Sequence, residues 1–164
     1  MLSIAIYSDQ KEFVAEIRSM VQDFLIESKI VAKIQAFENN YKFITVPDSY
    51  DIYIMDMDSQ DDVLALGKQM KGIDNNGKFI YLCSDNSKAY LAAKIRADYY
   101  LGKPVDREEL VDILKEIKQD VQDDTIVIKI AGGERRVRAN TLNYINIVKR
   151  CLCYHMTDGN MFDG

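Results

Sequence analysis

The feature of the sequence that most constrains its fold is an alternation, repeated five times over the first 120 residues, of short apolar runs and helix-period stretches. Each apolar run is rich in β-branched and aromatic residues, which is typical of a buried strand. The runs cover residues 2–7, 30–37, 51–56, 79–83 and 98–101. Parallel neighbours in a sheet need a crossover connection, usually a helix. The alternation therefore predicts an α/β fold, with a five-stranded parallel sheet covered by helices on both faces.

The connecting stretches carry apolar residues three and four positions apart, the spacing of an amphipathic helix. The predicted helices cover residues 11–27, 61–71, 86–95 and 106–121. Asp106, two residues after Pro104, stands at the N-cap of the last one. Residues 38–48 are polar and predict a loop or a weak helix, and the sequence DNNG at 74–77 predicts a turn.

After residue 124 the pattern changes, because no helical stretch separates the remaining apolar runs. Predicted strands cover 125–130, 134–139, 143–148 and 150–157, with tight turns at 132–133 and 158–159. We expect a short C-terminal all-β segment that forms an antiparallel meander. The chain would then have two domains, at 1–121 and 122–164. The second has about 40 residues, which is marginal for an independent core. We expect it to be a truncated domain or one that a partner completes.

The distribution of charge and the number of cysteines indicate the partners and the cellular compartment of the chain. Residues 1–124 hold 15 basic and 23 acidic residues, whereas residues 125–164 hold 6 and 3, within a net charge of −5. Such a contrast indicates two modules with different partners. Three cysteines, an odd number, favour a reducing compartment. With no signal peptide and no run near the roughly 18 apolar residues of a membrane span, we expect a cytoplasmic protein without a membrane partner.

The segment YDIYIMDMDSQDD, residues 50–62, joins a run of β-formers to four carboxylates. In open parallel sheets, functional groups gather beyond the carboxyl ends of the strands. Asp9 follows the first predicted strand, Asp56 closes the third and Lys103 follows the fifth. Cys83 and Ser84 close the fourth. We therefore expect these side chains to meet at one edge of the sheet.

Carboxylates around one point suit a hard divalent cation such as Mg²⁺, which prefers oxygen ligands and keeps several waters. A lysine opposite them adds a positive charge for phosphate oxygens. Phosphoryl transfer depends mainly on such positioning and charge neutralisation. Asp56 is the candidate nucleophile, because a carboxylate can form an acyl phosphate.

Three segments carry a resemblance to a known family. IAIYSDQ, YDIYIMDMD and ADYYLGKPV resemble the receiver domain of two-component response regulators, over residues 1–121. The resemblance implies a flavodoxin-like sheet with strand order 2-1-3-4-5. The tail IVIKIAGGERRVRANTLNYINIVKRCLCYHMTDG resembles the first half of a LytTR-type DNA-binding domain, through its hydrophobic frame and its NYI and DG landmarks.

The resemblance implies that Asp56 is the phosphoacceptor, with Asp9 as a Mg²⁺ ligand and Asp58 contributing its backbone carbonyl. Lys103 would pair with the phosphate, with a cis bond to the following proline, and Tyr100 would be the aromatic residue that changes rotamer on activation. A sensor histidine kinase would supply the phosphate, and the chain would form a homodimer. DNA would be the target in the full-length context. Such a chain is a regulatory phosphoprotein rather than an enzyme, with at most slow autodephosphorylation.

Three positions depart from the family pattern. The first of the two usual acids after strand one is Ser8, and the hydroxyl position at the end of strand four holds Cys83, with Ser84 one place later. The loop DMDSQDD after the acceptor lacks the usual proline and glycine. A thiol is a weak donor, so its link to a phosphate is weaker. The alternative is a degenerate receiver that acts as a phosphate-independent interaction and dimerisation domain.

Other functions fit less well. The DMD sequence also occurs in haloacid-dehalogenase-type phosphatases, but there it usually follows the first strand, and Gln60 replaces the expected Thr or Val. A flavin-binding flavodoxin would need a Ser/Thr-rich phosphate loop after strand one. Asp61 and Asp62 are explained as the N-cap and first turn of a helix.

In the tail, Cys151, Cys153 and His155 alternate along one strand, so a metal site is conceivable, but inward-facing core residues are the preferred interpretation. The basic residues form either a solvated face or a phosphate-contacting patch. They are Lys129, Arg135, Arg136, Arg138, Lys149 and Arg150.

Overall fold

The computed structural model describes residues 2–45, 49–73, 76–95, 97–123, 125–149, 151–157 and 159–163. Contacts within the chain divide it into two compact units, Met1–Lys115 and Glu116–Gly164, so that the division falls inside one helix. The boundary between residues 121 and 122 stays a prediction.

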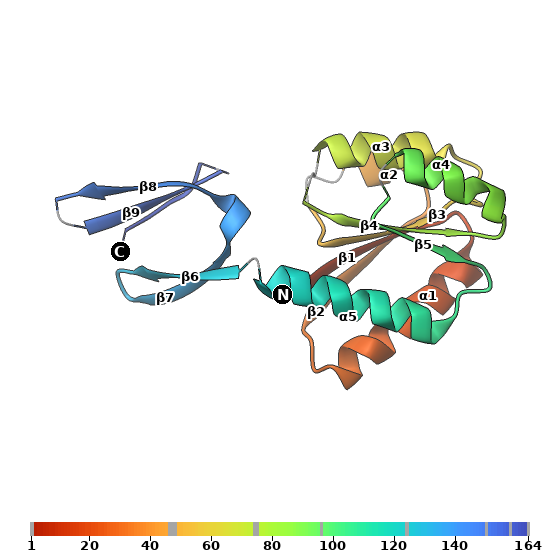
Figure 1. Ribbon diagram of the computed structural model, residues 1–164, viewed down its shortest axis with the longest axis horizontal. Coiled ribbons are helices and arrows are strands. Elements are labelled where there is room, and N and C mark those ends of the chain that lie inside the picture. Colours follow the sequence, from red (N-terminus) through yellow and green to blue (C-terminus); the bar gives the residue numbers. More distant parts are fainter. Residues whose placement is uncertain are drawn as a thin grey trace. The chain divides into compact units, whose positions relative to one another are not determined.

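The first unit is built on a five-stranded parallel sheet in the order β2-β1-β3-β4-β5 (Figure 1). Its strands are β1 (Leu2–Tyr7), β2 (Ala32–Phe37), β3 (Ile52–Asp56), β4 (Lys78–Cys83) and β5 (Tyr99–Gly102). The central strand β3 pairs in parallel with β1 and β4, and all of its residues are buried. This confirms the predicted α/β fold and its strand order.

The helices lie on both faces of this sheet. They are α1 (Lys11–Glu27), α2 (Asn40–Thr45), α3 (Val63–Ile73), the 3₁₀ turn η1 (Asn86–Lys88), α4 (Ala89–Lys94) and α5 (Arg107–Asp123). In Figure 1, α1 and α5 cover one face, and α2, α3 and α4 cover the other. Within the described ranges, no helix has the length and apolar character that crossing a membrane requires.

The two helix starts for which a cap was expected are capped by aspartates. The backbone N–H of Glu109 donates to the Asp106 carboxylate, at 3.0 Å, just before α5. The backbone N–H of Ala65 donates to the Asp62 carboxylate, also at 3.0 Å, before α3. A carboxylate at this position satisfies an N–H that has no partner within the helix and interacts favourably with the helix dipole.

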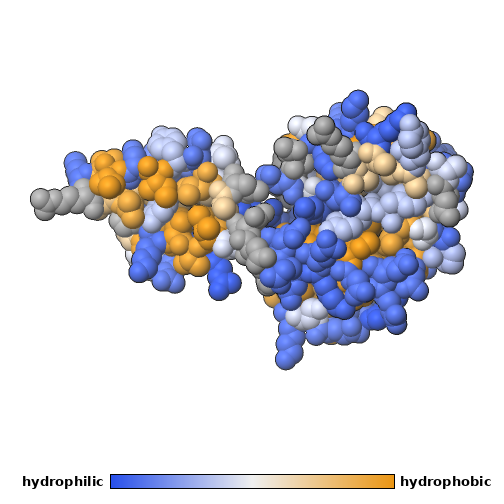
Figure 2. Space-filling view, viewed as in Figure 1, coloured by the Kyte–Doolittle hydropathy of each residue, from blue (hydrophilic) through white to orange (hydrophobic). Residues whose placement is uncertain are grey.

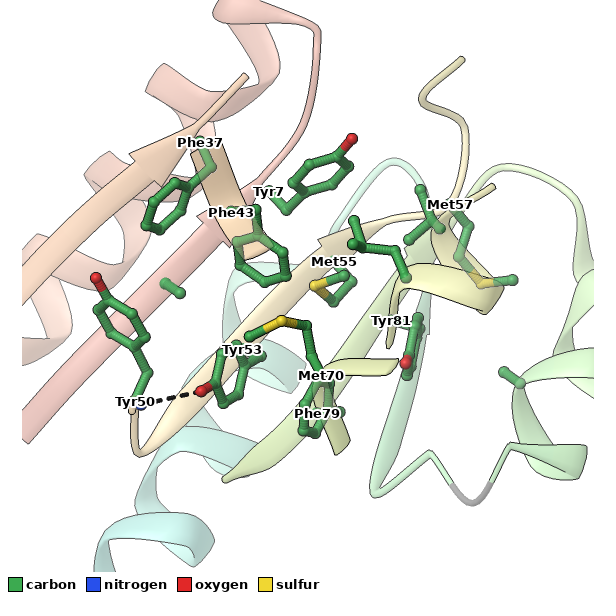
Figure 3. Packing of buried hydrophobic residues seen from close by; sticks show 14 of the residues in the cluster. Tyr7, Phe37, Phe43, Tyr50, Tyr53, Met55, Met57, Met70, Phe79 and Tyr81 are labelled. Carbon is green, nitrogen blue, oxygen red and sulfur yellow. Dashed lines mark hydrogen bonds between the residues drawn. The ribbon is translucent and has the colours of Figure 1, made fainter. Parts of the chain in front are cut away.

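One face of the sheet is aromatic. Tyr7, Tyr53, Phe79 and Tyr81 point toward the α2-α3-α4 layer and pack with residues of β2 and of these helices (Figure 3). The rings of Tyr53 and Phe79 stack, with centroids 4.4 Å apart. Tyr7 and Phe43 also contact, at 5.2 Å between centroids. Large aromatic rings bury much apolar surface, so this layer contributes strongly to stability.

The opposite face is aliphatic, because successive side chains of a strand point to opposite sides. Its fully buried residues from the sheet are Ile4, Ile6, Ile52, Ile54, Ile80 and Leu82. Buried residues of α1 and α5 cover them, among them Ile17, Val21, Leu110 and Leu114. With both faces covered, the strands are near-continuous apolar runs, as is expected of a parallel sheet.

The second unit contains two small antiparallel sheets. One is the hairpin of β6 (Thr125–Ile130) and β7 (Gly133–Arg138), and the other is ordered β10-β9-β8, from β8 (Leu142–Val148), β9 (Cys151–Met156) and β10 (Met161–Asp163). The 3₁₀ turn η2 (Ala139–Thr141) connects them. Gly132 and Gly133 have φ values of +111° and +149°, which only glycine adopts readily, so they form the predicted hairpin turn.

The structure corrects several details of the sequence predictions. The tail is two sheets rather than one meander, and β10 was missed. Ala131 N–H donates to the Asp163 carbonyl at 2.8 Å, which joins the hairpin turn to β10. Residues 38–48 contain the short helix α2, and the predicted turn at 74–77 lies partly outside the described residues.

The second unit has a small core and exposed apolar side chains. Hydrophobic side chains gather on the part of its surface seen in Figure 2. Among the described residues of its strands, the buried hydrophobic ones are Ile128, Cys153, Tyr154 and Met156, whereas much of β8 is exposed, Ile147 at 72%. The second unit therefore leaves an apolar strand open to solvent, and whether a partner or further chain completes this domain stays a prediction.

Two glycines of α3 give a matched test of how closely this helix packs on the sheet. A Cβ at Gly67 would overlap the Tyr81 hydroxyl and come within 2.9 Å of its ring carbon Cζ, whereas a Cβ at Gly72 would meet nothing within 4 Å. We expect Gly67→Ala to lower the free energy of unfolding by about 1–3 kcal/mol through overpacking. Gly72→Ala should raise it by about 0.5–1 kcal/mol, because alanine favours a helix. Urea denaturation measures both, and the same sign of change in the two variants would contradict the packing described here.

Candidate functional site

The candidate site lies at the carboxyl edge of the five-stranded sheet. Asp56 is the last residue of β3, Cys83 the last of β4, and Lys103 follows β5 directly. Asp9 lies two residues after β1. Because all five strands run in the same direction, their carboxyl ends are brought to one edge. There Lys103 contacts Asp56 and Cys83 directly, whereas Asp9 contacts the loop that follows β3.

Asp56 is buried, with 1% of the residue exposed. Its Oδ2 accepts a hydrogen bond from the Ser8 hydroxyl at 2.7 Å. Its Oδ1 accepts one from the backbone N–H of Asp58 at 2.9 Å and lies 2.5 Å from the Lys103 ammonium nitrogen. A buried carboxylate must be paired and hydrogen-bonded to remain charged, and Asp56 is both.

Lys103 is held in place from three directions. Its backbone N–H donates to the Cys83 carbonyl at 3.0 Å, and its peptide bond to Pro104 is cis, as the family resemblance implied. Its ammonium nitrogen lies 3.8 Å from the centre of the Phe13 ring, a cation–π contact with α1. With 12% of the side chain exposed, the ammonium group contacts both Asp56 and Asp58.

The Asp58 side chain points toward the ends of β4 and β5. Its Oδ2 lies 3.1 Å from Lys103 Nζ and accepts hydrogen bonds from the Ser84 hydroxyl, at 2.7 Å, and the Ser84 backbone N–H, at 2.9 Å. The Cys83 thiol donates to Oδ1, at 3.2 Å. Burial acts to raise the pKa of the Asp58 carboxyl, but the hydrogen bonds from Ser84 and Cys83 and the Lys103 ammonium outweigh it and hold the pKa well below its usual range.

Cys83 and Ser84 both contribute a side chain to the site, so Ser84 does not stand in for Cys83. Burial raises the pKa of the Cys83 thiol, and the neighbouring Asp58 carboxylate raises it further. The hydrogen bond from the Asp85 N–H acts in the opposite direction but is outweighed. The thiol therefore stays protonated at neutral pH and acts as a weak donor. Ser84 contributes a stronger hydroxyl donor one residue later, together with its backbone N–H.

Asp9 joins the site through the loop that follows β3. Its Oδ2 accepts the backbone N–H of Gln60 at 2.9 Å, and its own N–H donates to the Ser59 hydroxyl at 3.3 Å. Asp9 is half-buried, whereas Ser8 before it is fully buried and contacts Asp56. The two carboxylates of Asp9 and Asp56 thus both accept N–H groups of one loop, residues 56–60.

Tyr100 is half-buried beside Cys83. Its hydroxyl donates to the Asp85 carbonyl at 3.1 Å, which links β5 to the loop after β4. Burial and the neighbouring Cys83 raise the pKa of Tyr100 to about 12, so the hydroxyl stays a donor at any physiological pH. This contact joins the aromatic ring predicted as a switch to the loop that carries Ser84.

Sequence reasoning missed Lys88. Its ammonium nitrogen lies 3.8 Å from Asp58 Oδ1 and 3.4 Å from the Met57 carbonyl oxygen. Lys88 belongs to η1, which begins a few residues after β4 ends. Functional groups gather beyond the carboxyl ends of parallel strands, and this rule, which identified Lys103, also points to the segment after β4. The sequence therefore contained the information needed to predict Lys88.

Asp61 has a contact that sequence reasoning also missed. Its carboxylate accepts a hydrogen bond from the Tyr7 hydroxyl. Burial, together with that hydrogen bond to the Asp61 carboxylate, raises the pKa of Tyr7 well above its ordinary value. Asp61 therefore anchors the loop after β3 to the end of β1, whereas Asp62 serves as the helix cap described above.

Over the described part of the chain, no group of three or more His, Cys, Asp or Glu side chains is arranged to hold a metal ion. In β9, Cys153 is buried but Cys151 is exposed, so the expectation that the alternating trio faces the core is wrong for Cys151. The third member, His155, is half-buried, stacks on Tyr144 and lies 3.1 Å from the Asn146 side-chain oxygen.

The arrangement as a whole combines a buried carboxylate with an ammonium group, a hydroxyl and backbone N–H groups. These donors are of the kinds that bind phosphate oxygens. The donor set for a cation is all oxygen: the carboxylates of Asp9 and Asp56 and the carbonyl of Asp58. Mg²⁺ commonly takes one or two carboxylates together with waters and substrate oxygens, so these residues fit that ion.

We expect Lys103→Met to lower the free energy of unfolding by about 3 kcal/mol, because it leaves Asp56 as a buried charge without its cation. Replacing Asp56 by Asn in the Lys103→Met background should recover part of this loss. The control is Lys115→Met, which breaks an exposed ion pair with Asp112 and should change stability by less than about 1 kcal/mol. Equal effects of the two lysine substitutions in urea denaturation would contradict the description of Lys103 as a buried partner.

Comparison with known proteins gives a structural result only. No protein-family model matches the sequence, and no curated protein is significantly similar to it. Solved structures are similar in fold. An activated DrrB receiver domain with bound beryllium fluoride has 20% identity and a TM-score of 0.61, and covers 73% of this chain and 98% of its own. The DrrB response regulator of Thermotoga maritima, an OmpR/PhoB homolog, has 17% identity and a TM-score of 0.63, over 85% of this chain and 60% of its own.

A third similar structure is described differently. It is a putative pilus assembly protein, CpaE, from Burkholderia thailandensis, with 18% identity and a TM-score of 0.61, covering 73% of this chain and 99% of its own. At such identities the likeness establishes the fold and not the activity. The first unit of this chain therefore has the fold of response-regulator receiver domains, a fold that it also shares with a protein described by another role.

Proposed function

We propose that this chain is the receiver module of a two-component response regulator and that Asp56 accepts the phosphoryl group. The observation that carries this proposal is the 2.5 Å contact between Lys103 Nζ and Asp56 Oδ1 at the carboxyl edge of a receiver-like sheet. A phosphorylated carboxylate needs a cation beside it, and here the cation is already in position.

The proposed reaction uses Asp56 as the nucleophile. A carboxylate oxygen of Asp56 attacks phosphorus, the bond between phosphorus and the donor's leaving group breaks, and an acyl phosphate forms on Asp56. Lys103 stabilises the negative charge that develops on the phosphoryl oxygens, and Ser84 supplies a hydroxyl and an N–H nearby. Attack by Asp56 Oδ2 requires its hydrogen bond from Ser8 to break.

Mg²⁺ is the proposed cofactor, held by Asp9, Asp56 and the Asp58 carbonyl. When bound, it would neutralise part of the negative charge of the phosphoryl group. Because Ser8 stands in place of a second acid, Asp9 is the ligand from the loop after β1. We expect the apparent affinity for Mg²⁺ to depend on Asp9 more strongly than on any other side chain outside β3.

A sensor histidine kinase is the proposed phosphate donor, and the role is regulatory rather than that of an enzyme. The link from the site to the surface is Tyr100, whose hydroxyl is bonded to the loop after β4. A change in this loop alters the face formed near β5, where we propose that two copies associate. In a full-length context, the basic segment of residues 125–164 would carry that change to DNA.

The alternative is a receiver that works without phosphate, and specific contacts favour it. Ser8 occupies Asp56 Oδ2, and the Asp58 carboxylate shares Lys103. Both contacts compete with a phosphoryl group. In that case the unit would serve as a protein-interaction and dimerisation domain with a fixed conformation.

Incubation with acetyl phosphate and Mg²⁺, followed by intact mass measurement, tests the proposal. Wild type should gain the mass of one phosphoryl group, and Asp56→Asn should gain none. Asp61→Asn is the matched control, because Asp61 lies in the same loop but contacts Tyr7 rather than Lys103, and it should be modified like wild type. No mass increase in wild type, or an increase that persists in Asp56→Asn, would exclude Asp56 as the acceptor and favour the alternative.

A further inference from the structure

The Asp58 carboxylate takes part in more contacts than a turn residue needs. The proposed function uses only its backbone carbonyl. Yet its two oxygens accept three hydrogen bonds from Ser84 and Cys83 and lie near two ammonium groups, those of Lys103 and Lys88. These donors come from the ends of β4 and β5 and from η1. The Asp58 side chain therefore contacts residues that lie 25 or more positions further along the chain.

The donors around Asp58 are those that a phosphoryl group on Asp56 would require. An ammonium group, a hydroxyl and a backbone N–H bind anionic oxygens regardless of whether the anion is a carboxylate or a phosphate. Lys103 Nζ lies 2.5 Å from Asp56 Oδ1 and 3.1 Å from Asp58 Oδ2. A phosphoryl group attached to Asp56 beside Lys103 would therefore enter the space that Asp58 occupies.

Charge reinforces this overlap. Two carboxylates that share one lysine repel each other, and the pair is stable here because Ser84 and Lys88 supply further compensation on the Asp58 side. Addition of a phosphoryl group brings more negative charge to the same lysine. The aspartyl phosphate on Asp56 and the Asp58 carboxylate cannot both keep Lys103 and Ser84, and the Asp58 side chain, 20% exposed, has a path to solvent.

We infer that the Asp58 carboxylate is a built-in anion: it orders the loop after β4 in the unphosphorylated protein, and it competes with the phosphoryl group for Lys103 and Ser84. The second half of this inference rests on the proposed function, and the first half does not. A receiver with such a residue has its β4 loop in an anion-bound arrangement before any phosphate arrives.

The ordering is tested on the full chain without phosphate, by hydrogen exchange of the Ser84 amide measured by NMR. That N–H donates to Asp58 Oδ2, so Asp58→Ala should speed its exchange about tenfold. Asp61→Ala removes the same charge from the same loop without touching Ser84, and should leave the exchange rate unchanged. Equal Ser84 exchange in wild type and Asp58→Ala would overturn the inference.

A second variant keeps the test valid where Asp58→Ala is too unstable. Asp58→Asn preserves the size of the side chain and one oxygen acceptor but removes the charge. We expect Ser84 exchange in Asp58→Asn to lie between that of wild type and of Asp58→Ala. Exchange in Asp58→Asn that equals wild type would mean that charge has no part in ordering the loop, and would contradict a built-in anion.

The competition is tested by the rate of phosphorylation with acetyl phosphate and Mg²⁺. Asp58→Ala should react at least about fivefold faster than wild type and Asp61→Ala, because no internal anion has to leave. An equal or slower rate would overturn the competition. Absence of phosphorylation in every variant would instead refute the proposed function, and the Ser84 exchange would still decide whether Asp58 orders the loop.

Discussion

The ammonium group of Lys103 is the interaction on which the carboxyl edge of the sheet depends. Asp56 is fully buried at the end of the central strand, and a buried carboxylate is costly unless a cation and hydrogen bonds compensate it. Lys103 supplies that cation for Asp56 and for Asp58 together. Its position is fixed by backbone contact with Cys83 and by the Phe13 ring, so the charge is held by the fold rather than by a flexible surface side chain.

The sheet determines which groups can meet Lys103. Parallel pairing of β3 with β1 and β4 places the residues after these strands at one edge, while the aromatic and aliphatic layers fix the strands between two sets of helices. The site is therefore polar groups on loops, supported by a rigid apolar scaffold. The fully buried Ser8 belongs to these polar groups, because its hydroxyl donates to the Asp56 carboxylate.

The sequence predicted what depends on local pattern. The bounds of β1, α1 and β6 agree with the structure, as does the N-cap at Asp106, because buried strands, amphipathic stripes and caps leave a signal within a few residues. The strand order followed from the family resemblance. The placement of Asp56 and Lys103 at one edge followed from the rule for parallel sheets.

What the sequence did not predict depends on tertiary contacts. The strand β10 has three residues and exists through pairing with β9, which no local pattern reports. Asp58 was expected to contribute only its backbone carbonyl, because the contacts of its carboxylate depend on side chains at or beyond the ends of β4 and β5. Lys88 was missed because only residues at or directly after the strand ends were considered, whereas Lys88 lies in η1, beyond the end of β4.

The burial of the thiols has a practical consequence. Cys83 is buried beside Tyr100 and Asp58, and Cys153 is buried in β9, whereas Cys151 is open to solvent. Under native conditions a maleimide reagent therefore meets one accessible sulfur in the wild-type chain. A fluorophore attached there would report on the second unit, with no engineered residue and with the carboxyl edge of the five-stranded sheet left chemically untouched.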